Sequence, residues 1–341
     1  MGNSLLDIQP HKVSTDLSGY ITYIYGAPKT GKTTLATQME GSLLLAFEPG
    51  YNALPGVMAK DILSWKDMRT TFKELKDPEV HKIFKAVIID TIDIAADRCK
   101  KYVCQQNGIE DLGDLGYGKG WTKFKDEFNE VFRGLTQLGY AVFFIGHDKE
   151  TLTQLSDGTP ISLIRPALTK SVKEVITGMA DIYGYAHQPG GDVDKMSILT
   201  LRDPSGLIDC GCRIKYIKPE FELSYSNLVS EMAKAIEREA KEHDGQYITT
   251  ERNELPVAKE YNLPELLNEF NEIIAKIPGY DDVDGSTEEG KKFAEFWFPS
   301  IQRIVESNLG KGKKISQATA DQVEMVAEIV EELTDLIAKN N

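Results

Sequence analysis

The residues best suited to chemistry lie close together near the N-terminus, in the run Gly26-Ala27-Pro28-Lys29-Thr30-Gly31-Lys32-Thr33-Thr34. This run matches the pattern G-x-x-x-x-G-K-[ST], whose glycines let backbone N–H groups curl around phosphate oxygens. Lys32 would reach the β- and γ-phosphates of a nucleotide, and the Thr33 hydroxyl would hold Mg²⁺. An apolar stretch precedes the run and a helical pattern follows it, which is the usual setting of a phosphate-binding loop; the alternative is a glycine-rich turn without a ligand.

Two carboxylates further along the chain would complete such a site. Val87-Ile88-Ile89-Asp90 is an apolar strand that ends in a carboxylate, the Walker B pattern, so Asp90 would position Mg²⁺. The alternative is a helix cap, since Thr91 and Asp93 follow. Hydrolysis also needs a group that orients or deprotonates water. No acidic residue follows Asp90 directly, so we expect this base to be Glu48, where another apolar strand ends at the same edge of the sheet; the alternative is a structural glutamate.

The elements that must position these residues follow an α/β pattern from residue 20 to about 228. Apolar strands alternating with helices predict a mainly parallel sheet that helices cover on both faces. Turn residues at 156–158 and 203–206 predict two hairpins, which would pair 151–155 with 159–164 and 195–202 with 207–213. The strands are expected at 20–25, 42–47, 85–89 and 139–145, and the helices at 32–39, 92–106, 122–138 and 227–242.

The length of 341 residues suggests two domains, at roughly 100–200 residues each. We predict an N-terminal segment (1–19), a nucleotide-binding core (20–242), a linker (243–262) and an acidic helical C-terminal region (263–341). Helices of the last region are expected at 264–277, at 287–307 with an interruption at Pro299, and at 318–339. The basic run 310–314 between the last two is interpreted as a solvated loop or, alternatively, a phosphate-binding patch.

The charge is negative and unevenly distributed. The chain has 39 Lys+Arg and 53 Asp+Glu, a net charge of −14, of which residues 246–341 contribute −9. This balance argues weakly against DNA binding, because Lys and Arg drive contacts with phosphates, but it leaves room for a local basic face in the front part. The 41% hydrophobic and 27% charged composition excludes wholesale disorder and fibrous proteins.

Other sequence features bear on the compartment. The longest apolar runs, 43–47 and 141–145, have five residues, whereas a membrane-spanning helix needs about 20. We also find no secretory signal, so we expect a cytoplasmic protein without a membrane partner. The four cysteines are interpreted as free thiols; a metal or redox role for the lone Cys210/Cys212 pair is the alternative.

The order of these motifs resembles that of RecA-like ATPases. Glu48 after the second strand, Asp90 at the end of an apolar strand and a polar residue at the end of the next strand carry the resemblance, over roughly residues 20–228. Ile145–Glu150 and Tyr117–Trp121 are similar more specifically to phage-encoded RecA-core ATPases, some of which are single-strand annealing recombinases of the Sak type. The resemblance implies a RecA-like P-loop NTPase core, ATP and Mg²⁺ as cofactors, single-stranded DNA as a partner, and a homo-oligomer, ring or filament.

The resemblance also implies roles for individual residues. His147 would sense the γ-phosphate; the alternative is a histidine satisfied at a strand end. Residues 114–121 and 148–167 would be DNA-binding loops, in which Tyr117 and Trp121 stack on bases while Lys119 and Lys149 contact phosphates. The alternative is a glycine-rich surface loop whose aromatic side chains pack onto the core.

Two basic residues near the end of the core, Arg213 and Lys215, would enter the ATP site of a neighbouring subunit and offset charge on the γ-phosphate. The alternative is a solvated strand edge. The chain has only about 19 residues where RecA has a long N-terminal helical domain, and the second loop is not conspicuously basic. Annealing, or an auxiliary ATPase role in phage replication, is therefore favoured over strand exchange. The acidic C-terminal region would bind a protein partner or screen DNA from the core.

Two other functions remain as alternatives. One is a nucleotide-gated adaptor of phage replication that does not hydrolyse ATP in response to DNA. The other is a small-molecule kinase, which would need several arginines to clamp the transferred phosphoryl group. Only Arg98 and Arg133 lie between Asp90 and His147, which counts against a kinase. The absence of an N/T-K-x-D motif after the core strands weakly favours ATP over GTP.

Overall fold

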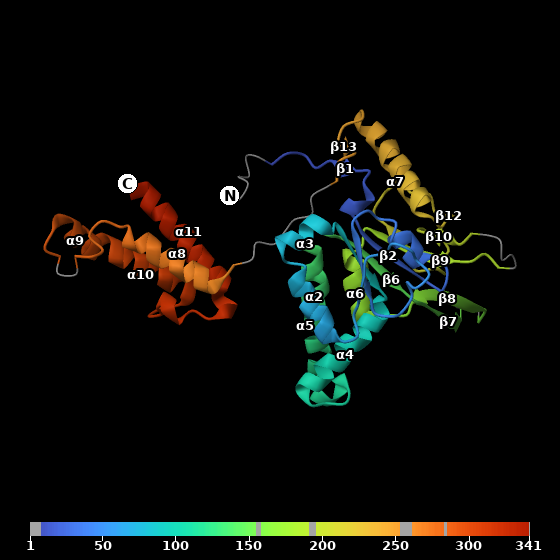
Figure 1. Cartoon of the computed structure of the whole chain (residues 1–341), viewed down its shortest axis with the longest axis horizontal. Coiled ribbons are helices and arrows are strands. Elements are labelled where there is room, and N and C mark those ends of the chain that lie inside the picture. The colour runs from blue at the N-terminus through green and yellow to red at the C-terminus, as the bar shows by residue number, and fades with distance from the viewer. Residues whose placement is uncertain (1–7, 155–157, 191–195, 253–260, 283–284, 341) are drawn as a thin grey trace. The chain divides into compact units, whose positions relative to one another are not determined.

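The chain folds into two units, Met1–Val257 and Ala258–Asn341, which we describe separately (Figure 1). The computed structural model describes residues 8–154, 158–190, 196–252, 261–282 and 285–340. No helix in these ranges is long and apolar enough to cross a membrane.

A nine-stranded sheet forms the centre of the first unit, in the order β12-β10-β9-β2-β6-β5-β3-β4, with β11 paired to β9. The six strands from β9 to β4 are parallel, and β10, β11 and β12 are antiparallel to their neighbours. This confirms the predicted α/β class with a mainly parallel sheet. The strands are β2 (Ile21–Gly26), β3 (Ser42–Ala46), β4 (Ala59–Asp61), β5 (Ala86–Asp90), β6 (Ala141–Gly146), β9 (Ile182–His187), β10 (Ile198–Thr200), β11 (Gly211–Cys212) and β12 (Glu220–Glu222).

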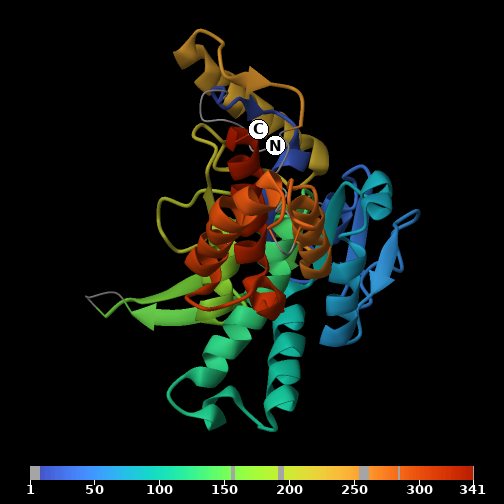
Figure 2. The same cartoon turned by 90° about the vertical axis from the view of Figure 1, so that its left-hand side faces the viewer.

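Helices cover both faces of this sheet, which explains why β5 and β6 are buried along their whole length. One face packs against α2 (Trp65–Glu74), α4 (Ile92–Asn107), α5 (Lys119–Thr136) and α6 (Lys170–Met179), and α3 (Pro78–Ile83) adds to this layer. The other face packs against α1 (Lys32–Ala36) and α7 (Tyr225–Ala240). In Figure 2, α4 and α5 form a helical hairpin that extends away from the sheet. Short 3-10 turns occur at η2 (Leu17–Gly19), η3 (Leu112–Leu115) and η4 (Lys241–His243).

The first predicted hairpin is present and the second prediction is wrong. β7 (Asp148–Gln154) pairs antiparallel with β8 (Pro160–Pro166), although residues 155–157 of its turn lie outside the described part of the chain. β10 pairs with β9 and β12 rather than with β11, because this position buries Leu199 in the sheet. The sequence analysis did not predict β9, because its residues IYGYAH mix aromatic side chains with glycine and histidine and form no apolar run.

The segment that we expected to be a linker is partly structured. Ile248–Thr249 forms strand β13, which pairs in parallel with β1 (Val13–Ser14). The Ser14 hydroxyl donates to the Glu251 carbonyl (2.7 Å), and Arg252 Nη2 donates to the Gly139 carbonyl (2.6 Å). Residues 248–252 therefore pack with the first unit, while residues 253–260 lie outside the described part of the chain.

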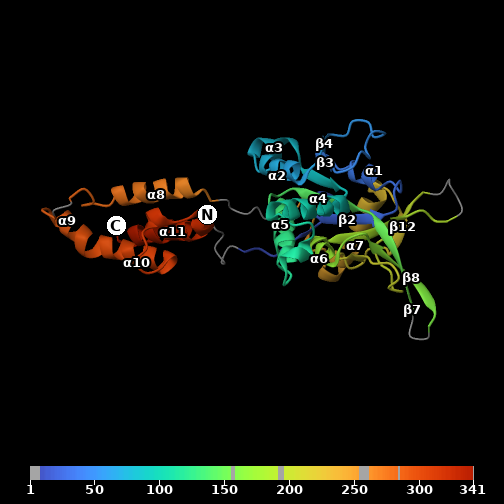
Figure 3. The ribbon, with the colours of Figure 1, turned by 90° about the horizontal axis from the view of Figure 1, so that it is seen from below.

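The second unit is a small helical bundle (Figure 3). Its own core includes Leu266, Phe270, Trp297, Ile301, Val326 and Leu333. The chain stays helical through Pro299, and the expected interruption is a change of helix type: the π-helical turn η5 ends at Trp297, just before Pro299, and continues directly into α10. The elements are α8 (Leu263–Ala275), α9 (Glu288–Lys292), η5 (Phe293–Trp297), α10 (Phe298–Leu309), η6 (Ile315–Gln317), η7 (Ala320–Gln322) and α11 (Val323–Asn340).

Candidate nucleotide-binding and hydrolytic site

The predicted phosphate-binding loop connects the end of β2 to the start of α1. A Cβ on Gly26 would lie only 2.0 Å from the carbonyl oxygen of Ala186 on β9, so the chain can leave the sheet here only as glycine. Gly31 has a φ of 92°, a left-handed conformation that glycine adopts without strain, and it turns the chain into the helix at Lys32. The helix ends at Ala36, three residues before the predicted end.

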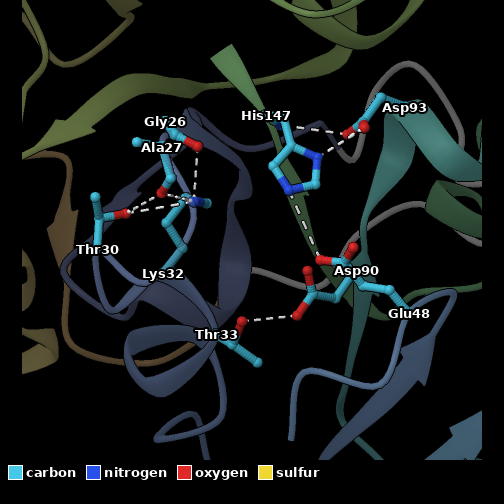
Figure 4. Close-up of polar contacts among 9 residues, drawn as sticks. All are labelled: Gly26, Ala27, Thr30, Lys32, Thr33, Glu48, Asp90, Asp93 and His147. Carbon is cyan, nitrogen blue, oxygen red and sulfur yellow. Dashed lines mark hydrogen bonds and ion pairs between the residues drawn. The ribbon is translucent and has the colours of Figure 1, made fainter.

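Lys32 is buried and turned into the loop. Its Nζ donates to the carbonyls of Gly26 (2.8 Å) and Ala27 (2.7 Å) and lies 3.3 Å from the hydroxyl of Thr30 (Figure 4). Burial lowers the pKa of Lys32, although nearby carboxylates, Asp90 foremost, oppose this shift. A phosphate oxygen is a stronger hydrogen-bond partner for an ammonium than a neutral carbonyl is. The Lys32 ammonium is therefore available to pair with an anionic ligand in the loop.

Thr33 and Asp90 meet across the site. The Thr33 hydroxyl donates to Oδ2 of Asp90 at 2.7 Å. Burial raises the pKa of the Asp90 carboxyl, and the hydrogen bond from Thr33 opposes the rise. A buried carboxylate beside a hydroxyl fits Mg²⁺, which prefers oxygen ligands. Within the described ranges no group of three or more His, Cys, Asp or Glu could hold a metal by itself, so Mg²⁺ would depend on this pair together with phosphate oxygens.

His147, Asp93 and Glu48 form a second polar cluster beside Asp90 (Figure 4). His147, directly after β6, donates its backbone N–H to Oδ1 of Asp93 (3.2 Å), and its ring Nδ1 lies 2.8 Å from Oδ2. Its Nε2 lies 3.7 Å from Oε1 of Glu48, which is ion-pair range but longer than a hydrogen bond. The cluster therefore places the expected catalytic carboxylate within reach of an oriented imidazole.

Asp93 also controls the charge of this imidazole. The hydrogen bond with Asp93 raises the pKa of His147, against the effect of burial. Burial works against ionisation of Asp93, but its contacts with His147 outweigh that effect and lower its pKa. Both shifts favour an imidazolium–carboxylate pair.

Replacing Asp93 with asparagine is expected to lower the pKa of His147, because an amide does not support the positive charge. NMR titration of the His147 ring measures this shift, with His147→Gln to assign the resonance and Asp97→Asn, an exposed change on the same helix, as control. A His147 pKa that is the same in Asp93→Asn and the wild type would contradict the pairing.

The stability of this variant should depend on pH. The raised pKa of His147 gives a contribution that is complete below its unfolded value of 6.5 and is lost as the pH rises through its folded pKa. The lowered pKa of Asp93 gives a contribution that is present above 3.8 and is lost as the pH falls through its folded pKa. The loss in free energy of unfolding, about 1.5–3 kcal/mol for a hydrogen bond to a charged group, is therefore expected to be largest between about pH 4 and 6.5.

Arg98, on α4, holds the turn that presents Glu48. Its Nη2 donates to the carbonyl of Phe47 at 2.7 Å, and its guanidinium lies 5.3 Å from the centre of the Phe47 ring. Sequence reasoning missed the roles of Asp93 and Arg98. Their signal was weak: Asp93 is the second residue of α4, three residues after Asp90 at the end of β5, and Arg98 lies further along the same helix.

The structure places Arg213 and Lys215 away from this cluster. β11 pairs with the start of β9, whereas the phosphate-binding loop lies near the end of β9. Arg213 therefore lies on the side of the sheet where the parallel strands begin, opposite to the side where they end and where the nucleotide site lies. Arg213 pairs with Asp181 (2.9 Å) and Lys215 with Glu242 (2.8 Å). Their action in the site of a neighbouring subunit stays a prediction.

Of the residues predicted to bind DNA, Tyr117, Lys119 and Trp121 lie beyond the far end of α4, whereas Lys149 stands on β7, two residues after His147 of the nucleotide site. From Asp93 to its last residue, Asn107, α4 rises about 21 Å, and a loop follows this far end. Tyr117 in this loop is fully exposed (103%), whereas Trp121 is 40% exposed and packs edge-on against Phe124. The alternative that the aromatic side chains pack onto the core therefore holds in part for Trp121 and does not hold for Tyr117. Lys119 begins α5, and Lys149 Nζ donates to the Leu168 carbonyl (3.3 Å).

Three comparisons place this chain among known proteins, and one of them, the match to a protein family, covers the site. Over 99% of its length the chain is 28% identical to the SPbeta prophage-derived uncharacterized protein YorG of Bacillus subtilis (strain 168), which it covers completely. A solved ATPase from the type III secretion system of pathogenic bacteria matches 92% of this chain and 81% of its own, with 12% identity and a TM-score of 0.30, a likeness too slight to bear on the site. The AAA domain matches residues 18–208, which is more than half of the chain and includes every residue of the nucleotide site described above. The chain belongs to the AAA domain family.

Proposed function

We propose that this protein is an ATP-binding and ATP-hydrolysing RecA-like phage protein that acts in DNA recombination or replication and binds single-stranded DNA as an oligomer. One observation carries the ATPase part: Lys32, the Thr33–Asp90 pair and the cluster of Glu48, His147 and Asp93 all lie at one edge of the sheet. The likeness to a prophage-derived protein supports the phage origin.

The proposal gives each group a step. The loop N–H groups and Lys32 would bind the β- and γ-phosphates, and Thr33 and Asp90 would hold Mg²⁺. When bound there, Mg²⁺ supplies positive charge that offsets the phosphate oxygens. Glu48 orients the attacking water and accepts its proton. His147, fixed by Asp93, points Nε2 toward Glu48 and can exchange this partner for the γ-phosphate.

The test is phosphate release from ATP by the full chain with Mg²⁺, with and without single-stranded DNA. Hydrolysis that DNA stimulates supports the whole proposal. Hydrolysis indifferent to DNA would remove the DNA part, and ATP binding without hydrolysis would favour the nucleotide-gated adaptor.

A cleft between the starts of α5 and α6 supports the DNA part. It has a volume of about 510 Å³, and Trp121, Lys125, Thr169 and Lys170 line it, with Glu174 as the one carboxylate among its lining residues. An exposed aromatic ring next to two lysines is a suitable combination for a nucleotide base and its phosphates. Sequence reasoning named Trp121 and missed the two lysines, because they lie 45 residues apart on different helices.

Replacing Trp121 with alanine is expected to weaken binding of single-stranded DNA by about 5- to 150-fold, the value of one stacked base. Lys125→Glu and Lys170→Glu should each weaken binding and reduce the slope of log K against log salt by about 0.7 or more. Fluorescence anisotropy with a labelled oligonucleotide measures both quantities. Lys66→Glu, an equal charge change on α2, serves as control, and loss of affinity equal to that of this control would refute the assignment.

The remaining parts of the proposal concern protein partners. Arg213 and Lys215 would act in a neighbouring subunit of the oligomer, and the C-terminal unit would bind another protein.

A further inference from the structure

The C-terminal unit contains an apolar groove with a volume of about 560 Å³. We call it the α8–α10 groove. Its walls are mostly apolar and aromatic, and its main lining residues are Phe270, Ile274, Tyr280, Phe293, Phe298 and Ile301. This volume lies in the range of sites that hold a compact ligand or a few side chains of a partner.

Large aromatic side chains stay exposed along this groove, although the unit has a core of its own. Phe298 is 57% exposed and Tyr280 is 43% exposed. Phe293 begins the π-helical turn, and such turns occur frequently at functional sites. Exposed apolar surface gathered around a hollow is typical of a binding site rather than of a solvated face.

The rim of the groove carries charge opposite to that of the unit. Residues 258–341 include 17 acidic and 9 basic residues, yet three of those basic residues are lysines within 311–314. Lys313 and Lys314 line the groove, and in the described part of the chain neither has an ion-pair partner. Glu306, which also lines it, accepts a hydrogen bond from Gln302 (3.0 Å).

We infer that the α8–α10 groove binds a short segment of a partner protein in which bulky apolar side chains stand next to carboxylates. The apolar side chains would enter the hollow, and the carboxylates would pair with Lys313 and Lys314. A nucleic acid is disfavoured because a net charge of −8 over residues 258–341 repels a polyanion. The inference deepens the proposal that this unit binds a protein partner and does not depend on ATP hydrolysis.

Selection from a random peptide library displayed on phage tests this inference without a known partner. The full chain is immobilised, and binders to the Lys313→Glu/Lys314→Glu variant are removed by counter-selection. We expect enrichment of peptides that carry at least two bulky apolar residues and a net negative charge. Synthetic copies should bind the wild type at least about 10-fold more tightly than they bind this variant or Phe298→Ala.

The matched control is Lys291→Glu/Lys292→Glu, the same charge change on α9 outside the lining of the groove, which should keep full affinity. Thermal unfolding shows that each variant is folded; Phe298 is exposed enough for alanine to be tolerated. Absence of enrichment, enrichment of basic peptides, or equal affinity for the Lys313→Glu/Lys314→Glu variant would overturn the inference. Binding that persists in Lys32→Ala separates this result from the ATPase proposal.

Discussion

Replacing Lys32 with alanine is expected to reduce kcat/KM for ATP by at least about 100-fold. The buried ammonium is positioned where the loop closes, and loss of one preorganised donor to a developing negative charge costs about 10²–10³ in rate. The variant also leaves the carbonyls of Gly26 and Ala27 without the Lys32 donor, so the empty loop should be less well ordered.

Phosphate release and nucleotide binding are measured together for this variant, with Lys66→Ala as a control that removes an exposed lysine. Thermal unfolding separates a local defect from loss of the fold. Turnover within a few-fold of the wild type would place the phosphate-binding function elsewhere and would remove the basis of the proposed ATPase.

Replacing Glu48 with glutamine is expected to separate ATP binding from hydrolysis. The amide has nearly the same shape, so contacts near His147 and the turn held by Arg98 remain, but it cannot accept a proton from water. General-base catalysis contributes about 10²–10⁴ in rate, so hydrolysis should fall by that factor while the Kd for ATP changes little.

Single-turnover hydrolysis and equilibrium binding of a fluorescent ATP analogue give the two quantities. Glu79→Gln, an exposed change on α3, is the matched control. Unchanged turnover in Glu48→Gln would show that another group activates the water, whereas weakened ATP binding would show that Glu48 acts mainly in the ground state.

Local patterns predicted most of the core that carries the nucleotide site. Three of the four predicted central strands contain apolar runs of four or five residues, at 43–47, 86–89 and 141–145, whereas the strand at 20–25 carries Thr22. Runs of this kind are typical of parallel strands that are buried on both faces. The phosphate-binding loop could be predicted because its glycines and Lys32 follow one another within nine residues. Asp90 and Glu48 could be placed because parallel strands end at the same edge of a sheet.

Contacts between distant residues could not be predicted in the same way. Asp93 and His147 are 54 residues apart, and only the order of β5 and β6 in the sheet brings them together. We predicted that the segment of β10 pairs with residues 207–213, because a turn signal lies between the two. That signal does not reveal β9, a third strand whose free edge pairs with β10 instead. In the C-terminal unit the acidic composition suggested a protein partner or a screen for DNA, whereas the fold places Lys313 and Lys314 beside an apolar groove that the sequence did not reveal.

The pairing of β1 with β13 has a mechanical consequence for a protein with two units. Residues 248–252, the last described residues before the second unit, are attached to β1 and, through Arg252, to the start of β6. Tension that arrives along the chain from the second unit would load these attachments before it reaches α7. A partner that pulls on the C-terminal unit would therefore load the side of the sheet where the parallel strands begin. The loop that contains Lys32 lies on the other side, where these strands end, and would not carry this load.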